Sequence, residues 1–247
     1  MKAIIDATPD VVASFAAKSS PEWCQKRENL EEMVDVNSRG VVNLGTATQQ
    51  LNIPTVTIST DHIFGGRSHF NWYLKRWLKA GPYDEDYVKI FPTNQYGISK
   101  YAGETMASSF PDMKVVRTSY LFDSERVLDE IFRITKNHNN TKSYPTFIHR
   151  SFMHVDHFVI SMMAYLKKIE FMPQTLHISG SKTVSWAKFM QDAVGMKGGV
   201  QHMDKVLTHK KNKKNLCPRP HKAGLVTELS AELGLPQFDY MDGLALL

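Results

Sequence analysis

The chain has 247 residues, of which 42% are apolar, 11% aromatic and 22% charged, and its formal net charge is +5. These proportions exclude a disordered or fibrous protein and fit one large domain, or one domain with a small appended lobe. The positive charge is local, because the stretch from Lys205 to Lys222 holds seven Lys or Arg and no acidic residue. A role in nucleic-acid binding would therefore depend on that stretch alone.

Short apolar runs alternate with longer helical stretches, which is typical of an α/β fold with a parallel sheet. The predicted strands are residues 11–15, 55–59, 114–118 and 175–178, and residues 144–149 are predicted to be extended. The predicted helices are residues 27–51, 94–109, 124–137 and 155–168, one that begins after Ser185, and a last one at 227–233. Residues 60–93 form a long aromatic-rich loop in which 72–78 is predicted to be a short helix. Loops of this length in compact domains are usually functional.

The motif with the clearest chemical meaning is Tyr96-Gly97-Ile98-Ser99-Lys100. Tyr96 and Lys100 are four residues apart and lie on one face of a helix, where the ammonium favours the phenolate of the tyrosine. Thr60 ends a predicted parallel strand, where α/β sheets bind their ligands. Together the three side chains fit the interconversion of a carbonyl and an alcohol, with hydride transfer from a nicotinamide. A Tyr and a Lys four apart also occur by chance in helices, so the context decides.

That context resembles a known family, the extended short-chain dehydrogenase/reductases. Residues 59–66 (Ser-Thr-Asp-His-Ile-Phe-Gly-Gly) resemble its S-T-D-Y-V-F-x-G signature. Residues 92–104 resemble the P-x-N-x-Y-G-x-S/T-K-x-x-G-E motif of the dTDP-4-dehydrorhamnose reductase branch. Weaker resemblances to that branch lie at residues 9–17, 117–120 and 219–225. The likeness therefore runs over most of the chain.

The resemblance implies reduction of a 4-keto group on a nucleotide-linked 6-deoxyhexose, with NADPH or NADH as the cofactor. It implies that Tyr96 is the general acid, that Lys100 lowers the pKa of Tyr96 and holds the nicotinamide ribose, and that Thr60 orients the carbonyl. The cofactor site that it implies comprises Ala16, Ala17, Ser59, Tyr96, Lys100, Arg117, Thr118 and Ser119. The substrate site that it implies comprises Thr60, Asp61, Tyr120, Arg219 and Pro220.

One element of the family pattern is not found in this sequence. Family members open with a strand, a glycine-rich turn and a helix that binds the cofactor pyrophosphate, and no G-x-G-x-x-G motif occurs near Met1. We therefore expect an N-terminally truncated Rossmann-type parallel sheet over residues 1–143. Residues 144–247 are expected to form mainly a small C-terminal substrate-binding lobe, interleaved with the sheet. A natural truncation, a fragment or misplaced start, and a partner chain that supplies the missing unit are alternative explanations.

Two other functions stay open at this stage. The first is a non-catalytic binding or regulatory subunit that has lost tight cofactor binding, and the second is nucleic-acid binding through residues 205–222, for which a solvated loop is the favoured alternative. The cysteines Cys24 and Cys217 have no metal-ligand spacing, and His149, His154 and His157 are interpreted as packing or surface residues, so no metal site is expected. With no signal peptide and no apolar run long enough to cross a membrane, a cytoplasmic location is expected. A second copy or a partner protein is expected to cover the edge of the truncated sheet.

Overall fold

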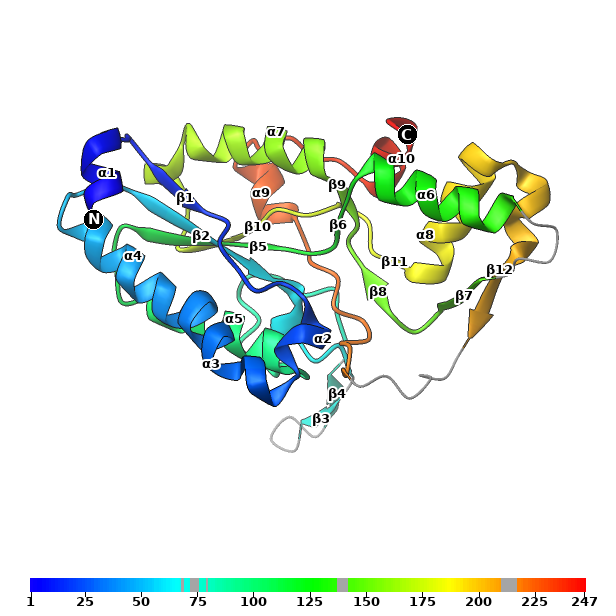
Figure 1. Cartoon of the computed structure of the whole chain (residues 1–247), viewed down its shortest axis with the longest axis horizontal. Helices are drawn as coiled ribbons and strands as arrows, with labels where there is room; N and C mark the ends of the chain where they lie inside the picture. Colours follow the sequence, from blue (N-terminus) through cyan, green and yellow to red (C-terminus); the bar gives the residue numbers. More distant parts are fainter. Residues whose placement is uncertain (68, 72–75, 79, 137–141, 210–216) are drawn as a thin grey trace.

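A four-stranded parallel sheet forms the centre of one half of the molecule (Figure 1). The computed structural model describes residues 1–67, 69–71, 76–78, 80–136, 142–209 and 217–247. The sheet order is β1 (Val12–Ser14), β2 (Thr55–Thr60), β5 (Met113–Thr118) and β10 (Thr175–His177), and every neighbouring pair is parallel. The predicted α/β class and the four predicted strands are therefore confirmed, to within about two residues at each end.

Helices cover both faces of this sheet (Figure 1). One face carries α3 (Leu30–Val34), η2 (Asp35–Arg39), α4 (Gly40–Gln49) and α5 (Gln95–Ala107). The opposite face carries α7 (Val155–Leu166) and α9 (Glu228–Glu232). Because side chains alternate along a strand, Val115 packs with Ala107 on the α5 side, and Val116 packs with Phe158 on the α7 side. The sheet is thus buried on both faces, as parallel sheets generally are.

The other half of the molecule is a smaller lobe around a separate apolar core, in which Phe152 and Phe189 stack with their ring centroids 4.3 Å apart. Its helical segments are α6 (Ser124–Thr135), α8 (Trp186–Ala193), η5 (Val194–Gly198), η6 (Val200–Lys205) and α10 (Tyr240–Ala245). Its strands form the two-stranded pairs β6 (Leu121–Phe122) with β9 (Met153–His154), β7 (Lys142–Pro145) with β12 (Val206–His209), and β8 (His149–Arg150) with β11 (Val184–Ser185). The chain passes back to the sheet at α7, β10 and α9. The proposed division at residue 143 stays a prediction.

Short segments complete the structure. They are α1 (Lys2–Ala7), α2 (Pro21–Cys24), η1 (Arg27–Asn29), η3 (Asp61–Ile63), η4 (Ile169–Phe171) and the antiparallel pair β3 (His69–Asn71) and β4 (Arg76–Leu78). Within the described ranges, no helix is both long enough and apolar enough to cross a membrane.

Most predicted helices are confirmed, and two predictions need correction. The predicted helix at 27–51 is present as η1, α3, η2 and α4, with π-helical geometry over η2. The predicted helix at 72–78 is wrong at 76–78, because those residues form β4 and pair with β3, while 72–75 lie outside the described residues. The helix at 227–233 is α9 and is not the last one. The sequence analysis missed α10, which Asp239 and Asp242 begin with a reciprocal capping box.

The centre of the lysine-rich stretch, residues 210–216, lies outside the part of the chain that the structure describes. The nucleic-acid hypothesis therefore stays a prediction.

Candidate functional site

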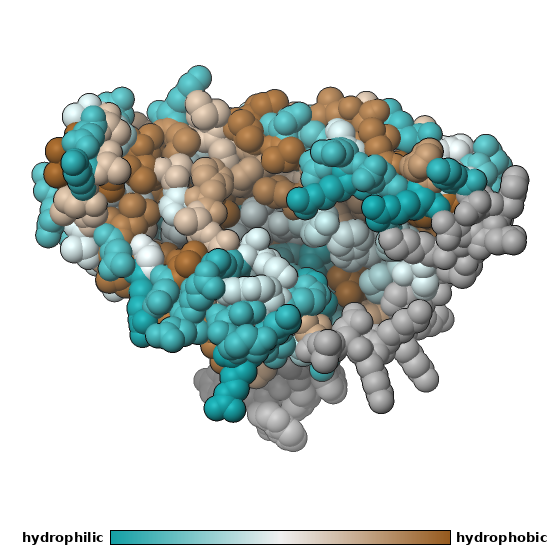
Figure 2. Space-filling model, viewed as in Figure 1, coloured by the Kyte–Doolittle hydropathy of each residue, from teal (hydrophilic) through white to brown (hydrophobic). Residues whose placement is uncertain are grey.

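A cavity of about 620 Å³ opens at the carboxyl end of β2. Figure 2 shows the molecular surface hollowed between the sheet half and the C-terminal lobe. Four stretches of the chain supply most of the lining: the end of β2 with η3, the first turns of α5, the residues after β5, and the segment that leads from β1 into α2. Arg126, Arg150 and Arg219 complete it. A cavity at the carboxyl edge of a parallel sheet is the usual place for a ligand in an α/β fold.

Helix α5 brings Tyr96 and Lys100 into this cavity one helical turn apart. Asn94 caps the helix, because its side-chain oxygen accepts a hydrogen bond of 2.8 Å from the backbone N–H of Gly97. A Cβ atom at Gly97 would lie 2.3 Å from the carbonyl oxygen of His62. Only glycine therefore allows α5 to approach η3 this closely, and that approach brings Tyr96 near Thr60.

The electrostatics of Tyr96 and Lys100 follow mainly from burial. Burial raises the pKa of Tyr96 to about 12, and the side-chain hydrogen bond with Thr60 opposes this rise. Burial lowers the pKa of Lys100 to about 8, although the carboxylate of Glu104 acts in the opposite direction. The sequence analysis expected Lys100 to lower the pKa of Tyr96, but desolvation has the larger effect. Tyr96 is therefore protonated at neutral pH, which is the state that a proton donor requires.

A buried ion pair forms another part of the cavity wall. The Nε atom of Arg150 lies 3.2 Å from Oδ2 of Asp61, and both side chains are 3% exposed. The carboxylate of Asp61 also accepts a hydrogen bond of 2.6 Å from Ser119 and a longer one of 3.4 Å from Thr60. Burial raises the pKa of Asp61 and the charge of Arg150 opposes that rise. The sequence analysis did not select Arg150, because its place in the cavity depends on β8, which lies 89 positions away along the chain from Asp61.

His62 occupies the position where the resembled signature has a tyrosine. Its ring meets the ring of Tyr96 edge-on at 5.4 Å between centroids, and its Nδ1 atom lies 3.1 Å from the side-chain amide of Asn94. Burial lowers the pKa of His62 well below its ordinary value. His62 is therefore a neutral side chain that packs against Tyr96.

The structure brings most of the predicted site residues to one cavity. Those that line it are Ala17, Ser59, Thr60, Asp61, Tyr96, Lys100, Thr118, Ser119, Tyr120 and Arg219. Arg219 stands at the rim and forms an ion pair with Glu22 of α2. The cavity lining does not include Ala16, Arg117 or Pro220. The guanidinium group of Arg117 points instead to Glu104, in the interior between α5 and β5.

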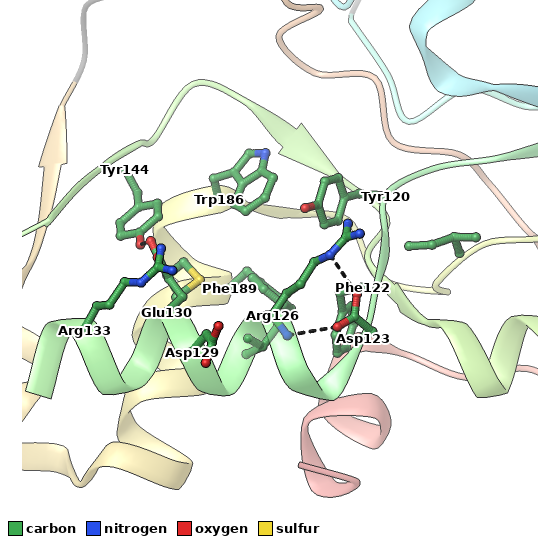
Figure 3. A pocket seen from close by; sticks show the side chains of 13 residues that line it. Tyr120, Phe122, Asp123, Arg126, Asp129, Glu130, Arg133, Tyr144, Trp186 and Phe189 are labelled. Atoms are coloured by element: carbon green, nitrogen blue, oxygen red, sulfur yellow. Dashed lines mark hydrogen bonds and ion pairs between the residues drawn. The ribbon is translucent and has the colours of Figure 1, made fainter. Parts of the chain in front are cut away.

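A second cavity of about 320 Å³ adjoins the first and shares Tyr120, Leu121 and Arg126 with it. Figure 3 shows Tyr120, Trp186 and Tyr144 along one side of this cavity and the charged side chains of α6 along the other. The rings of Tyr120 and Trp186 meet edge-on at 4.6 Å between centroids, and Arg126 pairs with Asp123 at 3.3 Å. The sequence analysis missed this cavity, because its aromatic residues come from three separate segments.

The first cavity fits the nicotinamide end of a dinucleotide. The hydroxyl oxygens of Ser59 and Thr118 are buried without a hydrogen-bond partner, and both residues line the cavity beside Lys100. The resembled family binds the cofactor pyrophosphate with a G-x-G-x-x-G turn, which this sequence does not contain. Within the described residues, the cavity has two unpaired hydroxyl groups beside Lys100.

Comparisons with known proteins show which proteins this chain is similar to. A family model described as the RmlD substrate binding domain matches residues 1–246. A dTDP-4-dehydrorhamnose reductase from Sinorhizobium fredii is 27% identical over 75% of this chain, and the match spans only 60% of that reductase. The spore coat polysaccharide biosynthesis protein SpsK from Bacillus subtilis is 24% identical over 92% of this chain and 74% of its own length.

Solved structures show the same fold at low sequence identity. A dTDP-4-dehydrorhamnose reductase from Bacillus anthracis, in complex with NADP, superposes with a TM-score of 0.81 at 22% identity. The superposition covers 99% of this chain and 82% of that reductase. WbmH from Bordetella bronchiseptica, in complex with NAD⁺, superposes with a TM-score of 0.71 at 16% identity. That superposition covers 99% of this chain and 76% of WbmH.

Proposed function

The chain belongs to the RmlD substrate-binding domain family, and on this basis we propose that it reduces the 4-keto group of a nucleotide-linked 6-deoxyhexose with NADPH or NADH. One observation carries the proposal: Thr60 of β2 and the α5 residues Tyr96 and Lys100 line one cavity at the carboxyl end of β2. The relatives named as dTDP-4-dehydrorhamnose reductases suggest the substrate class.

In the proposed reaction, Tyr96 donates its phenolic proton to the carbonyl oxygen of the sugar. The raised pKa of Tyr96 keeps that proton in place until charge develops on the oxygen. The ammonium of Lys100 then stabilises the phenolate one helical turn away. The hydroxyl of Thr60, which interacts with both Tyr96 and Asp61, orients the same carbonyl oxygen. A nicotinamide cofactor supplies the hydride when bound.

We propose that the sugar nucleotide extends from the first cavity into the second. The rings of Tyr120 and Trp186 offer a surface for the base, and the guanidinium groups of Arg126 and Arg219 lie where the two cavities meet and at the rim. Arginine forks match phosphate oxygens well. Ser59, Thr118 and Lys100 are the groups that we propose for the nicotinamide ribose. Ala16, Ala17, Arg117 and Ser119 stay predicted cofactor residues, and Pro220 a predicted substrate residue.

The proposed assembly and location follow from two smaller observations. Among the described strands, β1 pairs with β2 alone, so its other edge is open. We propose that a second copy or a partner protein covers this edge, because open edges of sheets tend to associate. Both cysteines are free thiols, which is consistent with the proposed cytosolic location.

The decisive assay follows NADPH and NADH oxidation with dTDP-4-dehydrorhamnose. We expect Tyr96→Phe to lower the rate by about 10²- to 10⁴-fold, because the variant keeps the ring and loses the proton donor. Equal rates for the two proteins would contradict the assignment of Tyr96.

A non-catalytic, regulatory role is the second candidate. Calorimetric titration with NADPH separates the two candidates. Binding at micromolar strength supports the reductase, and no binding at millimolar concentration supports the regulatory subunit.

A further inference from the structure

The face of α5 that carries Tyr96 and Lys100 continues for one more turn to Glu104. The three residues are spaced by four, so their side chains lie one above another along the helix. Lys100 is 5% exposed and Glu104 is 7% exposed. A lysine and a glutamate four apart would ordinarily form an ion pair, and burial would strengthen the attraction. The partner of this glutamate is instead a different cation.

Arg117 of β5 holds the Glu104 carboxylate with a fork of contacts. Its Nε atom lies 3.1 Å from each carboxylate oxygen, and its Nη2 atom lies 2.9 Å from Oε2. The side chains of Arg117 and Glu104 are 7% and 6% exposed. The guanidinium group also lies over the ring of Phe64 at 5.5 Å from its centroid. These contacts fix the carboxylate between the helix and the sheet.

Arg117 reaches two further groups on its far side. Its Nη1 atom lies 3.5 Å from the carbonyl oxygen of Glu85 and 3.5 Å from Nε2 of His177. Burial lowers the pKa of His177 to about 3, so that ring is neutral. The Glu85 carboxylate lies beside this neutral ring and accepts a hydrogen bond from the backbone N–H of His177. Glu104 is the partner of Arg117 on the helix that carries Lys100.

Lys100 is left without an ion pair of its own among the residues that the structure describes. The titratable and charged groups that line the same cavity as Lys100 are Glu22, Asp61, His62, Tyr96, Tyr120, Arg126, Arg150 and Arg219. Glu104 lines a small void on the other side together with Lys100. Asp61 is paired with Arg150, Glu22 is paired with Arg219, and His62 is neutral. Of these groups, Glu104 is the one whose charge acts on Lys100.

We propose that Glu104 and Arg117 are positioning residues that together set the charge of Lys100. Arg117 holds the Glu104 carboxylate one helical turn beyond the ammonium of Lys100. From there the carboxylate favours the charged form of Lys100, but its hydrogen bonds to Arg117 keep it from pairing with Lys100 directly. Burial lowers the pKa of Lys100 to about 8, and the Glu104 carboxylate limits that fall. The role in catalysis rests on the proposed function, whereas the charge of Lys100 is a property of the chain alone.

The test is an NMR titration of Lys100 in the full chain, followed through the Cε and Nζ resonances, which Lys100→Arg identifies by their loss. The wild-type midpoint is expected near pH 8. In Glu104→Gln we expect the midpoint to fall by about one pH unit, because the buried ammonium loses its supporting charge. Arg117→Lys keeps the opposite charge beside Glu104 and should retain a midpoint close to that of the wild type.

Glu85→Gln is the matched control. It removes a carboxylate from the same network, one that accepts a 2.8 Å hydrogen bond from the backbone of His177 and lies on the far side of Arg117. Its midpoint should equal that of the wild type. An unchanged midpoint in folded Glu104→Gln, or an equal fall in Glu85→Gln, would overturn the proposal.

Glu104→Gln leaves Arg117 as an uncompensated buried cation, which destabilises the folded protein. A second variant therefore tests the same effect without that charge. The double variant Glu104→Gln with Arg117→Met replaces the pair by neutral groups of similar shape, a change that proteins often tolerate. Its midpoint should also lie below that of the wild type, because the supporting carboxylate is absent.

A reductase assay across pH separates this inference from the proposed function. If the proposed function holds, the alkaline limb of kcat shifts to lower pH in Glu104→Gln while KM for the sugar nucleotide stays close to that of the wild type. If every protein lacks activity but the NMR midpoint still falls, the proposed function fails and the inference stands.

Discussion

Two buried arginine–carboxylate pairs flank the candidate site, and they differ in what they connect. Arg117–Glu104 joins β5 to α5 within the sheet half, and its guanidinium donors go to protein groups. Arg150–Asp61 joins β8 of the lobe to the end of β2, and both of its members line the cavity. The first pair acts on the site through Lys100, whereas the second forms part of its wall. Two ion pairs with similar burial therefore differ in role: one positions a charge beside Lys100, and the other faces the cavity directly.

The largest expected effect is on stability, when either arginine is replaced by Met. Breaking a buried ion pair leaves one uncompensated charge and costs roughly 3–5 kcal/mol. We expect Arg117→Met to lie at the upper end of that range, because Glu104 is enclosed between helix and sheet. Arg150→Met should cost less, because Asp61 faces a cavity that admits water. Urea unfolding of both variants measures the difference. A larger loss in Arg150→Met than in Arg117→Met would show that water in the cavity does not stabilise the unpaired carboxylate of Asp61.

Lys100 has an intermediate effect on the free energy of unfolding, and this effect depends on pH. Its pKa falls from the ordinary 10.5 to about 8 in the folded protein. Between these values the unfolded chain binds more protons than the folded chain, so the free energy of unfolding rises with pH. The contribution is on the order of 3 kcal/mol, present above pH 10.5 and lost as the pH falls to 8. Lys100→Met should not show this rise, so the wild-type-minus-variant difference in urea unfolding from pH 7.5 to 10.5 isolates it, and a flat difference would contradict the lowered pKa.

Sequence reasoning predicted the sheet and the central residues of the site, because both leave local patterns. The β-branched run at Thr55–Thr60 and the four-residue spacing of Tyr96 and Lys100 are visible in a single stretch of chain. The sequence could not show that Arg117 turns inward to Glu104, or that Arg150 reaches Asp61. These pairings depend on which strands lie next to α5 and to the cavity, and charge alone does not reveal a partner. The rise in the pKa of Tyr96 was missed for the same reason, since burial is a property of the folded chain.

The ion pair between Arg219 and Glu22 is exposed, and its loss is expected to have the smallest effect on the free energy of unfolding. Its side chains are 28% and 58% exposed, in contrast to the two buried pairs. Exposed pairs contribute about 0–1 kcal/mol and are screened by salt. Glu22→Gln should therefore change the free energy of unfolding by less than about 1 kcal/mol. Urea unfolding at low and high salt checks this, and the small difference between the proteins should vanish at high salt. A loss as large as that of Arg150→Met would show that the exposed pair, which joins α2 to Arg219, contributes as much to stability as a buried pair.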